Sequence, residues 1–321
     1  MSVLVYTENW DGKFKKMSFE LISYASKVAE MTGGSVTALS IGNVGDDELS
    51  SLGNYGASTI LSTGDVGAFD NQVYTGIISA AAEKSGAKII ILSNNNVGKA
   101  LAPRLSVRLK AGLASGVTSV PEATGPMIVS KKVFSGKAFV KVKILSDTAI
   151  LTLAQNSYEI VETGGKASVE PFDSGVDSST GKTIVKDVQK QTGKILLSDA
   201  EVVVSGGRGM KSGDNWQALE ELADVLGAAM ACSRPVSDEG WRSHDEHTGQ
   251  TGKIIAPNLY LAFGISGAIQ HLAGVSSSKY IVAVNTDKDA PIFEAADYGI
   301  VGDALQVLPE FINEIKAAKA Q

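Results

Sequence analysis

The chain has 321 residues, enough for two domains of ordinary size. Apolar residues make up 44% and charged residues 20%, and 29 Lys and Arg against 35 Asp and Glu give a net charge of −6. This composition is typical of a globular protein and argues against a disordered chain, and the mild acidity argues against a general nucleic-acid binder.

The single cysteine, Cys232, excludes an internal disulfide and fits a reducing compartment. It lies in an apolar run, so we expect a buried structural thiol. The N-terminal residues enter a strand pattern at once and lack the features of a signal peptide. No stretch approaches the roughly 20 apolar residues that cross a bilayer. We therefore expect a cytoplasmic protein without a membrane span.

Short apolar runs alternate with helical periodicity over the first hundred residues. The pattern predicts strands at 3–7, 36–41, 59–61 and 88–93, and helices at 19–31, 73–84 and 100–109. Strands that are apolar throughout and separated by helices indicate a parallel sheet covered on both faces. The first domain is therefore predicted to be Rossmann-like.

The pattern changes after Gly112. Four short apolar segments, bounded by Gly and Ser, predict extended or hairpin structure appended to the first domain: 117–120, 127–133, 138–144 and 149–153. Residues 162–194 are rich in Gly, Ser, Thr, Lys and Asp, and are interpreted as an excursion and a linker. We place the domain boundary near Gly193, with an N-terminal α/β domain at 1–192 and a C-terminal domain at 193–321.

The alternation of strands and helices resumes at Glu201. Strands are predicted at 201–205, 259–263, 280–285 and 298–301, and helices at 214–226, 265–272 and 303–316. Ser212 can cap the first of these helices and Gly227 can end it. The expected fold class is α/β with two domains, the second being a smaller, doubly wound sheet.

A glycine-rich turn, 205–213, follows the first strand of this second domain and opens a helix. Gly207, Gly209 and Gly213 make a G-x-G-x-x-x-G spacing, one residue longer than the usual dinucleotide fingerprint. Such a turn brings free N–H groups to a pyrophosphate, and Arg208 and Lys211 add positive charge. A tight turn without a ligand is the alternative.

Three further segments follow predicted strands or lie between them. Ser233-Arg234 stands where a nicotinamide-binding domain usually has an acidic residue, so Arg234 could accept a 2′-phosphate, lie beside another electron-rich group, or be a surface arginine. The loop 248–253 offers hydroxyl and amide groups. The turn 263–271 repeats the strand-to-helix arrangement, and two such turns favour a dinucleotide.

Other motifs do not support a reaction. Two Walker-like fragments, 175–183 and 250–253, lack the required spacing. His244 and His247 flank two acidic residues, but a fixed zinc site needs three or four supported ligands. No nucleophile elbow or acid–base pair of carboxylates is present. We therefore predict no catalytic residue and no metal site.

Seven motifs, taken in order, resemble the alpha subunits of electron-transfer flavoproteins. They are Gly206-Gly-Arg-Gly-Met-Lys-Ser-Gly213, Ser233-Arg234, Gly249-Gln-Thr-Gly-Lys253, Gly264-Ile-Ser-Gly-Ala-Ile-Gln-His-Leu-Ala-Gly274, Ile281-Val-Ala-Val-Asn285, Ala290-Pro-Ile-Phe293 and Ala296-Asp-Tyr-Gly-Ile-Val301. The match is dense over about 200–316, whereas the first 190 residues resemble the family only in layout.

The resemblance implies an FAD site in the second domain. The cofactor-binding residues that it implies are Arg208, Ser233, Arg234, Thr248, Gly249, Gln250, Thr251, Ser266, Gly267, Ala268, Ile269, Gln270, His271, Asn285 and Asp303. Arg208 and the turn 266–271 would contact the pyrophosphate, the ribityl chain and the ring region. The segments 233–234 and 248–251 would lie at the flavin ring, with His271 at its pyrimidine edge, and Asn285 and Asp303 at the adenosine.

A flavin that takes up an electron without a proton becomes negatively charged. A nearby cation and hydrogen-bond donors stabilise that charge, so we expect Arg234 and His271 to tune the redox potential. The cofactor carries the chemistry, and the chain is an electron-transfer protein rather than a substrate-transforming enzyme.

The resemblance also implies partners. The chain would form a heterodimer with a beta subunit, accept electrons from flavin dehydrogenases such as the acyl-CoA dehydrogenases of fatty acid beta-oxidation, and pass them to a quinone reductase or a similar acceptor. Three alternatives remain open: the alpha half of a bifurcating complex that uses NADH, an NADP-dependent oxidoreductase, and a non-redox protein that binds an adenine nucleotide.

Overall fold

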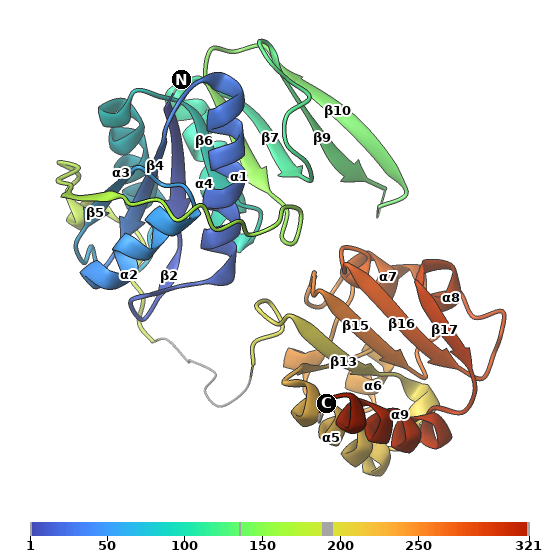
Figure 1. Cartoon of the computed structure of the whole chain (residues 1–321). Helices are drawn as coiled ribbons and strands as arrows, with labels where there is room; N and C mark the ends of the chain where they lie inside the picture. The colour runs from blue at the N-terminus through green and yellow to red at the C-terminus, as the bar shows by residue number, and fades with distance from the viewer. Residues whose placement is uncertain (1, 135, 188–194, 320–321) are drawn as a thin grey trace. The chain divides into compact units, whose positions relative to one another are not determined.

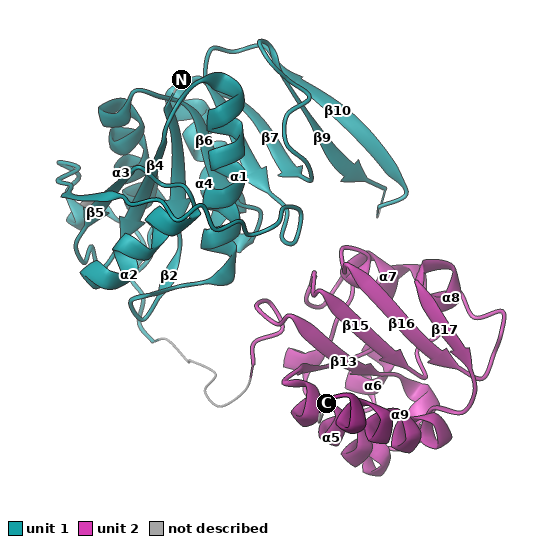
Figure 2. Ribbon diagram, viewed as in Figure 1, with its two compact units in different colours: residues 1–188 teal, residues 189–321 magenta. Residues whose placement is uncertain are grey.

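The computed structural model describes residues 2–134, 136–187 and 195–319. The chain divides into two compact units, Met1–Val188 and Gln189–Gln321 (Figure 2). Each unit is a parallel or mostly parallel sheet with helices packed on its faces (Figure 1), so the predicted α/β fold class is confirmed. Among the described residues, no helix is both long and apolar enough to cross a bilayer.

The central strands of the first unit are parallel and buried on both faces. They are β1 (Ser2–Thr7), β4 (Val36–Ile41), β5 (Thr59–Thr63), β6 (Ala87–Ser93) and β11 (Ala149–Leu153). One apolar core lies between this sheet and α1 (Lys16–Thr32), and a second lies on the opposite face against α3 (Asn71–Ser85) and α4 (Asn96–Leu109). Burial on both faces explains why these strands read as continuous apolar runs.

Helix ends in this unit follow local capping chemistry. The Asp70 side chain accepts hydrogen bonds from the backbone of Gln72 and Val73 at the start of α3. The Asn95 side chain accepts a hydrogen bond from Gly98 N at 2.9 Å, so α4 begins at Asn96 rather than at residue 100 as predicted. Asn is a preferred N-cap residue, so the earlier start follows from local capping chemistry.

The segment after Gly112 contributes to the sheet in two ways. An antiparallel extension is formed by β8 (Ala123–Thr124), β9 (Met127–Val133) and β10 (Ala138–Ile144), in agreement with the predicted hairpin structure. However, β7 (Gly112–Val117) and β11 pair in parallel with each other, and β11 also pairs with β6. Both strands therefore belong to the main sheet, which corrects the assignment of 149–153 to an appended segment and moves the strand predicted at 117–120 to Gly112–Val117.

The polar segment from residue 162 contains a strand that the composition did not predict. β12 (Ser168–Pro171) pairs in parallel with β5, which gives the strand order β10-β9-β7-β11-β6-β1-β4-β5-β12. An edge strand exposed to solvent needs few apolar residues, which explains why its composition resembled a linker. Residues 188–194 of the predicted linker lie outside the described residues.

The other short elements of the first unit are β2 (Asn9–Trp10), β3 (Lys13–Phe14), α2 (Asp46–Ser51), η1 (Leu52–Tyr55) and η2 (Ser178–Thr180).

The second unit has five parallel strands in the order β14-β13-β15-β16-β17. Their bounds are β13 (Val202–Gly206), β14 (Ala229–Cys232), β15 (Leu259–Phe263), β16 (Tyr280–Asn285) and β17 (Tyr298–Val301). The chain runs from β13 outward to β14 and then returns to place β15 on the other side of β13. The strand order therefore reverses between β13 and β15, and ligands of open α/β sheets bind at such a switch point.

Helices cover both faces of this sheet (Figure 1). One face carries α5 (Gln217–Leu226) and α9 (Ala304–Lys319), and the other carries α7 (Ile269–Val275) and α8 (Ile292–Ala295). Cys232 is fully buried in the core, as predicted, and burial raises the pKa of its thiol to about 12. The short elements are η3 (Arg208–Met210), η4 (Gly213–Trp216), α6 (Arg234–Asp238) and η5 (His244–Glu246).

Three segments of this unit differ from the sequence prediction. The predicted helix at 214–226 begins with η4 and becomes α-helical only at Gln217. α7 begins at Ile269, not at 265, because Gly264 and Gly267 adopt φ values of +64° and +81° that a helix does not admit. Ser266 and Gly267 thus belong to the turn before the helix. Arg234, predicted at a strand end, instead opens α6, with Ser233 at the N-cap position.

Candidate functional site

The predicted site residues gather at one edge of the second sheet. Gly207, Ser233 and Gly264 directly follow the carboxyl ends of β13, β14 and β15, while Asn285 ends β16 and Asp303 lies just beyond β17. Because all five strands are parallel, these ends share one edge of the sheet. The fold therefore brings site residues that are far apart in the sequence to the same edge of the sheet.

The two glycine turns at the switch point touch each other. Gly207 N donates to Phe263 O at 2.9 Å, and Gly209 N donates to Gly264 O at 3.0 Å. A Cβ on Gly209 would lie 2.5 Å from Gly264 Cα, and one on Gly207 would overlap the Gly264 carbonyl. Glycine at these positions thus allows the backbones of the two turns to pack against each other. The sequence motif alone did not indicate this requirement for glycine.

Unpaired donors line this edge. The backbone N–H groups of Ala268, Ile269 and Gln270 make no hydrogen bond with the described part of the chain. Arg208 is exposed and forms no ion pair with any residue in the described ranges. Free N–H groups at a strand-to-helix turn together with an arginine are the ordinary construction of an anion site.

The second turn is held in place by α8. The backbone N–H of Ile292 donates to Ser266 O at 3.0 Å, and the Cα of Gly267 faces that same backbone. A Cβ on Gly267 would overlap Ile292 N. The donors of the turn are therefore positioned before any ligand arrives.

Arg234 links two of the predicted segments. Its Nη1 donates to the Thr251 hydroxyl at 3.3 Å, and its Nε donates to the Asp238 carboxylate at 3.3 Å. The side chain is 62% exposed, whereas Ser233 is buried. The structure thus brings the start of α6 and the loop 248–253 together and leaves the guanidinium accessible.

The loop 248–253 is packed between β14 and α7. Thr248 N donates to Cys232 O at 3.0 Å, and Gln250 N donates to Gln270 O at 2.7 Å. Gly249 has a φ of +143° and lies against Gly274, so the loop backbone approaches α7 closely. As a result, Thr248 is buried while the side chains of Gln250 and Thr251 stay exposed at the edge.

His271 lies beneath the same edge and is 7% exposed. Its Nε2 is 2.8 Å from the hydroxyl of Tyr260, a fully buried residue of β15. Burial lowers the pKa of His271 to about 4, although the Thr248 backbone partly opposes this effect. At neutral pH the ring is therefore uncharged, so it can act near a ligand as a polar group but not as a cation.

The neutral ring makes the stability of the second unit depend on pH. Unfolded histidine titrates near a pKa of about 6.5, whereas the folded pKa of His271 is about 4. Between these values the unfolded state binds more protons, so the free energy of unfolding decreases as pH falls. We expect His271 to account for a loss on the order of 2–3 kcal/mol between about pH 7 and pH 4.5. Urea unfolding should show a smaller loss in His271→Gln, and an equal loss in both proteins would contradict the assignment.

Asn285 and Asp303, expected at the adenosine, also brace the turns of the site. The Asn285 amide donates to Ile265 O at 2.9 Å and accepts from Asp287 N at 2.9 Å. The Asp303 carboxylate pairs with Lys211 at 2.7 Å and caps α9 at Leu305 N. Lys211 thereby lowers the pKa of Asp303 and connects the glycine-rich turn to α9.

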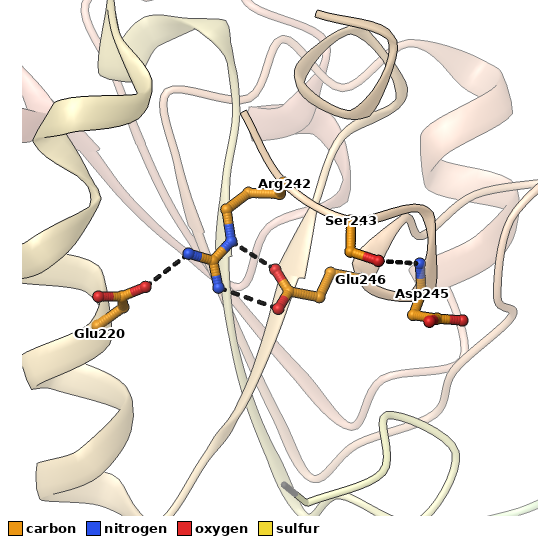
Figure 3. A network of polar contacts seen from close by, with 5 residues as sticks. All are labelled: Glu220, Arg242, Ser243, Asp245 and Glu246. Atoms are coloured by element: carbon orange, nitrogen blue, oxygen red, sulfur yellow. Dashed lines mark hydrogen bonds and ion pairs between the residues drawn. The ribbon is translucent and has the colours of Figure 1, made fainter. Parts of the chain in front are cut away.

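A buried ion-pair network in residues 236–247 was missed by the sequence analysis. Arg242 donates two hydrogen bonds to Glu246, at 2.6 and 2.9 Å, and a third to Glu220 on α5 at 2.5 Å (Figure 3). Its guanidinium carbon lies 5.1 Å from the Trp216 ring centroid. The i, i+4 spacing of Arg242 and Glu246 was a possible signal, but the segment looked like a solvated acidic loop. The network holds the residues that lead into the loop 248–253.

We expect Arg242→Ala to lower the free energy of unfolding by roughly 2–3 kcal/mol, because it leaves the buried Glu246 carboxylate without its bidentate partner. The Glu246 side chain is 10% exposed, whereas that of Glu220 is 48% exposed. Glu220→Gln should therefore change stability by only about 0.5 kcal/mol. Urea denaturation of both variants measures the difference, and equal losses would contradict a buried network.

His244 is engaged on the other side of this segment. Its Nδ1 lies 2.9 Å from the Ser237 hydroxyl. His247 is buried, and burial lowers its pKa, with Arg234 as the next cause. Among the described residues, no group of three or more His, Cys, Asp or Glu is placed to hold a metal ion.

Family models match both units. An electron transfer flavoprotein FAD-binding domain matches residues 196–276, and an electron transfer flavoprotein domain matches residues 3–176. Together they span most of the chain. The first match contains the glycine-rich turn, the start of α6, the loop 248–253 and the turn before α7.

Full-length relatives show the same likeness. The electron transfer flavoprotein subunit alpha of Syntrophomonas wolfei is 35% identical over 315 residues, covering 97% of this chain and 98% of the relative. That of Bacillus subtilis is 37% identical, covering 98% and 97%. A mitochondrial subunit alpha from Oryza sativa is 40% identical, covering 76% of this chain and 69% of the relative. Among solved structures, a protein described as a putative thiamin diphosphate-dependent enzyme from Mycobacterium smegmatis aligns at 12% identity with a TM-score of 0.23, covering 96% of this chain and 59% of that one.

Proposed function

The chain belongs to the electron transfer flavoprotein alpha-subunit family, and from this we propose that it is the FAD-carrying half of a heterodimeric electron carrier. Its second unit contains the FAD-binding domain of that family. When bound, FAD supplies the electron chemistry, because it exchanges electrons with donors and acceptors. The chain's own residues bind and orient the cofactor and set its electrostatic surroundings.

One observation carries the proposal: unpaired donors from two contacting turns lie at the switch point of a parallel sheet. Ala268, Ile269 and Gln270 offer free backbone N–H groups, and Arg208 offers an unpaired guanidinium within the described ranges. A pyrophosphate is a dianion that accepts several hydrogen bonds, which fits this edge. We therefore assign the pyrophosphate and ribityl chain to Arg208 and the turn 266–270.

The neighbouring side of the edge fits a heteroaromatic ring that gains negative charge. Arg234, Gln250 and Thr251 are exposed there, and the contact between Arg234 and Thr251 holds cation and hydroxyl together. We assign the flavin ring to the segments 233–234 and 248–251, with His271 beneath its pyrimidine edge. Asn285 and Asp303 are assigned to the adenosine end, where their side chains also fix the turns.

The two units have different proposed roles. We propose that residues 193–321 hold FAD and that residues 1–192 form the platform for the beta subunit. Large apolar side chains exposed on and beside the β9–β10 hairpin support a protein-binding role for the first unit: Phe134 at 81%, Phe139 at 66% and Leu145 at 79% exposure. Electrons would enter from flavin dehydrogenases, including acyl-CoA dehydrogenases, and leave to a quinone reductase or a similar acceptor.

The proposal is tested by co-expressing the chain with its beta subunit and recording the absorbance of the purified complex. A yellow heterodimer with flavin bands, reduced by an acyl-CoA dehydrogenase and its substrate, is the expected result. A colourless complex that binds NADPH would overturn the proposal in favour of an oxidoreductase. Retained AMP or ATP without flavin would indicate an interaction protein, and direct reduction by NADH would indicate a bifurcating complex.

A further inference from the structure

A buried pair of polar side chains lies beneath the proposed flavin edge. The Tyr260 hydroxyl, on β15, is 2.8 Å from Nε2 of His271, on α7. Tyr260 is fully buried, and His271 Nδ1 is buried and forms no hydrogen bond with the described part of the chain. The pair joins the sheet to the helix whose first turn carries the free N–H groups.

The two possible positions of the imidazole proton are not equivalent. If Nε2 carries the proton and donates to Tyr260, the phenol proton can turn only toward the hydroxyls of Ser205 and Thr248, neither of which forms a hydrogen bond with it in the described part of the chain, and the Nδ1 lone pair is left without a partner. If the phenol donates to Nε2, the proton sits on Nδ1 and only that one donor is left unpaired. A buried unpaired polar group costs about 1–3 kcal/mol, so the second arrangement is favoured.

We propose that Tyr260 is a positioning residue of the cofactor site, whose phenol donates to Nε2 of His271 and so holds the neutral ring with its proton on Nδ1. The proposal rests on the proposed function, because it takes His271 to lie beneath the flavin. Burial keeps the ring uncharged near neutral pH, as its lowered pKa shows, so the choice of tautomer is the variable that remains.

The tautomer matters because the ring lies beside the loop that faces the flavin. Gly249 lies against the backbone of Gln270 and His271, and Gln250 N donates to Gln270 O at 2.7 Å. With the proton on Nδ1, the unpaired side of the ring presents an N–H rather than a lone pair before any cofactor binds. A preorganised dipole of this kind costs no reorganisation when charge develops nearby.

The first test is the protonation state of the ring itself. We would label the histidines with ¹⁵N in the full chain in complex with its beta subunit, with and without FAD, and assign the ring of His271 by its loss in His271→Gln. The expected spectrum has a protonated Nδ1 and a hydrogen-bonded, unprotonated Nε2, with this tautomer favoured about tenfold or more. A proton on Nε2 in the wild-type chain overturns the proposal without any variant being made.

The second test removes only the hydroxyl. In Tyr260→Phe the tautomer ratio should fall by about fivefold or more, and the reduction equilibrium of the bound flavin should shift by a factor of up to about five. Tyr24→Phe is the matched control, since Tyr24 is equally buried but donates to Ser119 O at 3.1 Å in the first unit. An unchanged ratio, or a flavin equilibrium that moves no more than in the control, overturns the positioning role.

The two readouts separate this inference from the proposed function. The ¹⁵N measurement does not need flavin, so a chain with the Nδ1 proton and no flavin overturns the proposed function and supports the tautomer assignment. A flavin-loaded complex with the proton on Nε2 supports the proposed function and overturns the tautomer assignment.

Discussion

Arg234→Ala is expected to lower the one-electron midpoint potential of the bound flavin by roughly 60–120 mV, because a fixed positive charge that stabilises the reduced, negatively charged cofactor is lost. Two charges about 5 Å apart at an effective dielectric constant near 20 interact by about 3 kcal/mol. Solvent screening reduces this, since the Arg234 side chain is 62% exposed. The measurement is a stepwise reductive titration of the heterodimer.

Two variants act as controls for the charge of Arg234. Arg234→Lys keeps the positive charge but loses the contacts with both Asp238 and Thr251. The midpoint potential of the flavin should therefore stay close to that of the wild type. Asp238→Asn removes the carboxylate that partly neutralises the guanidinium, and the potential should rise slightly. If Arg234→Ala and the wild type gave the same midpoint potential, the charge of Arg234 would not stabilise the reduced flavin. Because His271 is neutral, it cannot compensate for the missing cation.

Gly267→Ala is expected to lower the free energy of unfolding of the second unit by roughly 2–5 kcal/mol and to abolish stable FAD binding. The residue has a φ of +81°, and a Cβ there would overlap the backbone N of Ile292. That N–H donates to Ser266 O, so the overlap would push the turn away from α8. The free donors of the turn would then move as well, because they follow directly in the chain.

Gly227→Ala provides the matched comparison. Gly227 ends α5 with a φ of +64°, but a Cβ there meets nothing within 4 Å. It should cost only the backbone strain, about 1–2 kcal/mol, and leave FAD binding unchanged. Urea denaturation and flavin retention after gel filtration measure both effects. Equal stability losses in the two variants would show that the turn does not depend on close packing against α8.

Much of the fold could be predicted because its strands are buried on both faces. β1, β4, β6 and β15 read as apolar runs for this reason. Elements whose stability comes from distant partners were missed. β12 pairs along the sheet edge with few apolar residues, and α4 depends on the capping side chain of Asn95. The first turn of α7 was placed too early because the backbone of Gly264 and Gly267 is not encoded in hydrophobic spacing.

The candidate site divides in the same way. Ser233-Arg234 and the turn 266–271 were found from residue types at strand ends, and the loop 248–253 from its hydroxyl and amide groups. The fold brings all three to one edge. Arg242 and Tyr260 were missed because each is defined by a partner elsewhere in the chain, Glu220 and His271 respectively. The spacing of sequence motifs does not indicate contacts between residues that are this far apart in the chain.

The sequence by itself determined the alternation of strands and helices, the family and the FAD domain, because these depend on local periodicity and on the order of short motifs. Only the tertiary structure decided that Gly207 and Gly209 pack against the neighbouring turn, that His271 is neutral, and that Arg234 remains the accessible cation beside Thr251. Strand order, burial and hydrogen-bond partners set these properties. They arise between residues far apart in the chain, so no local pattern contains them.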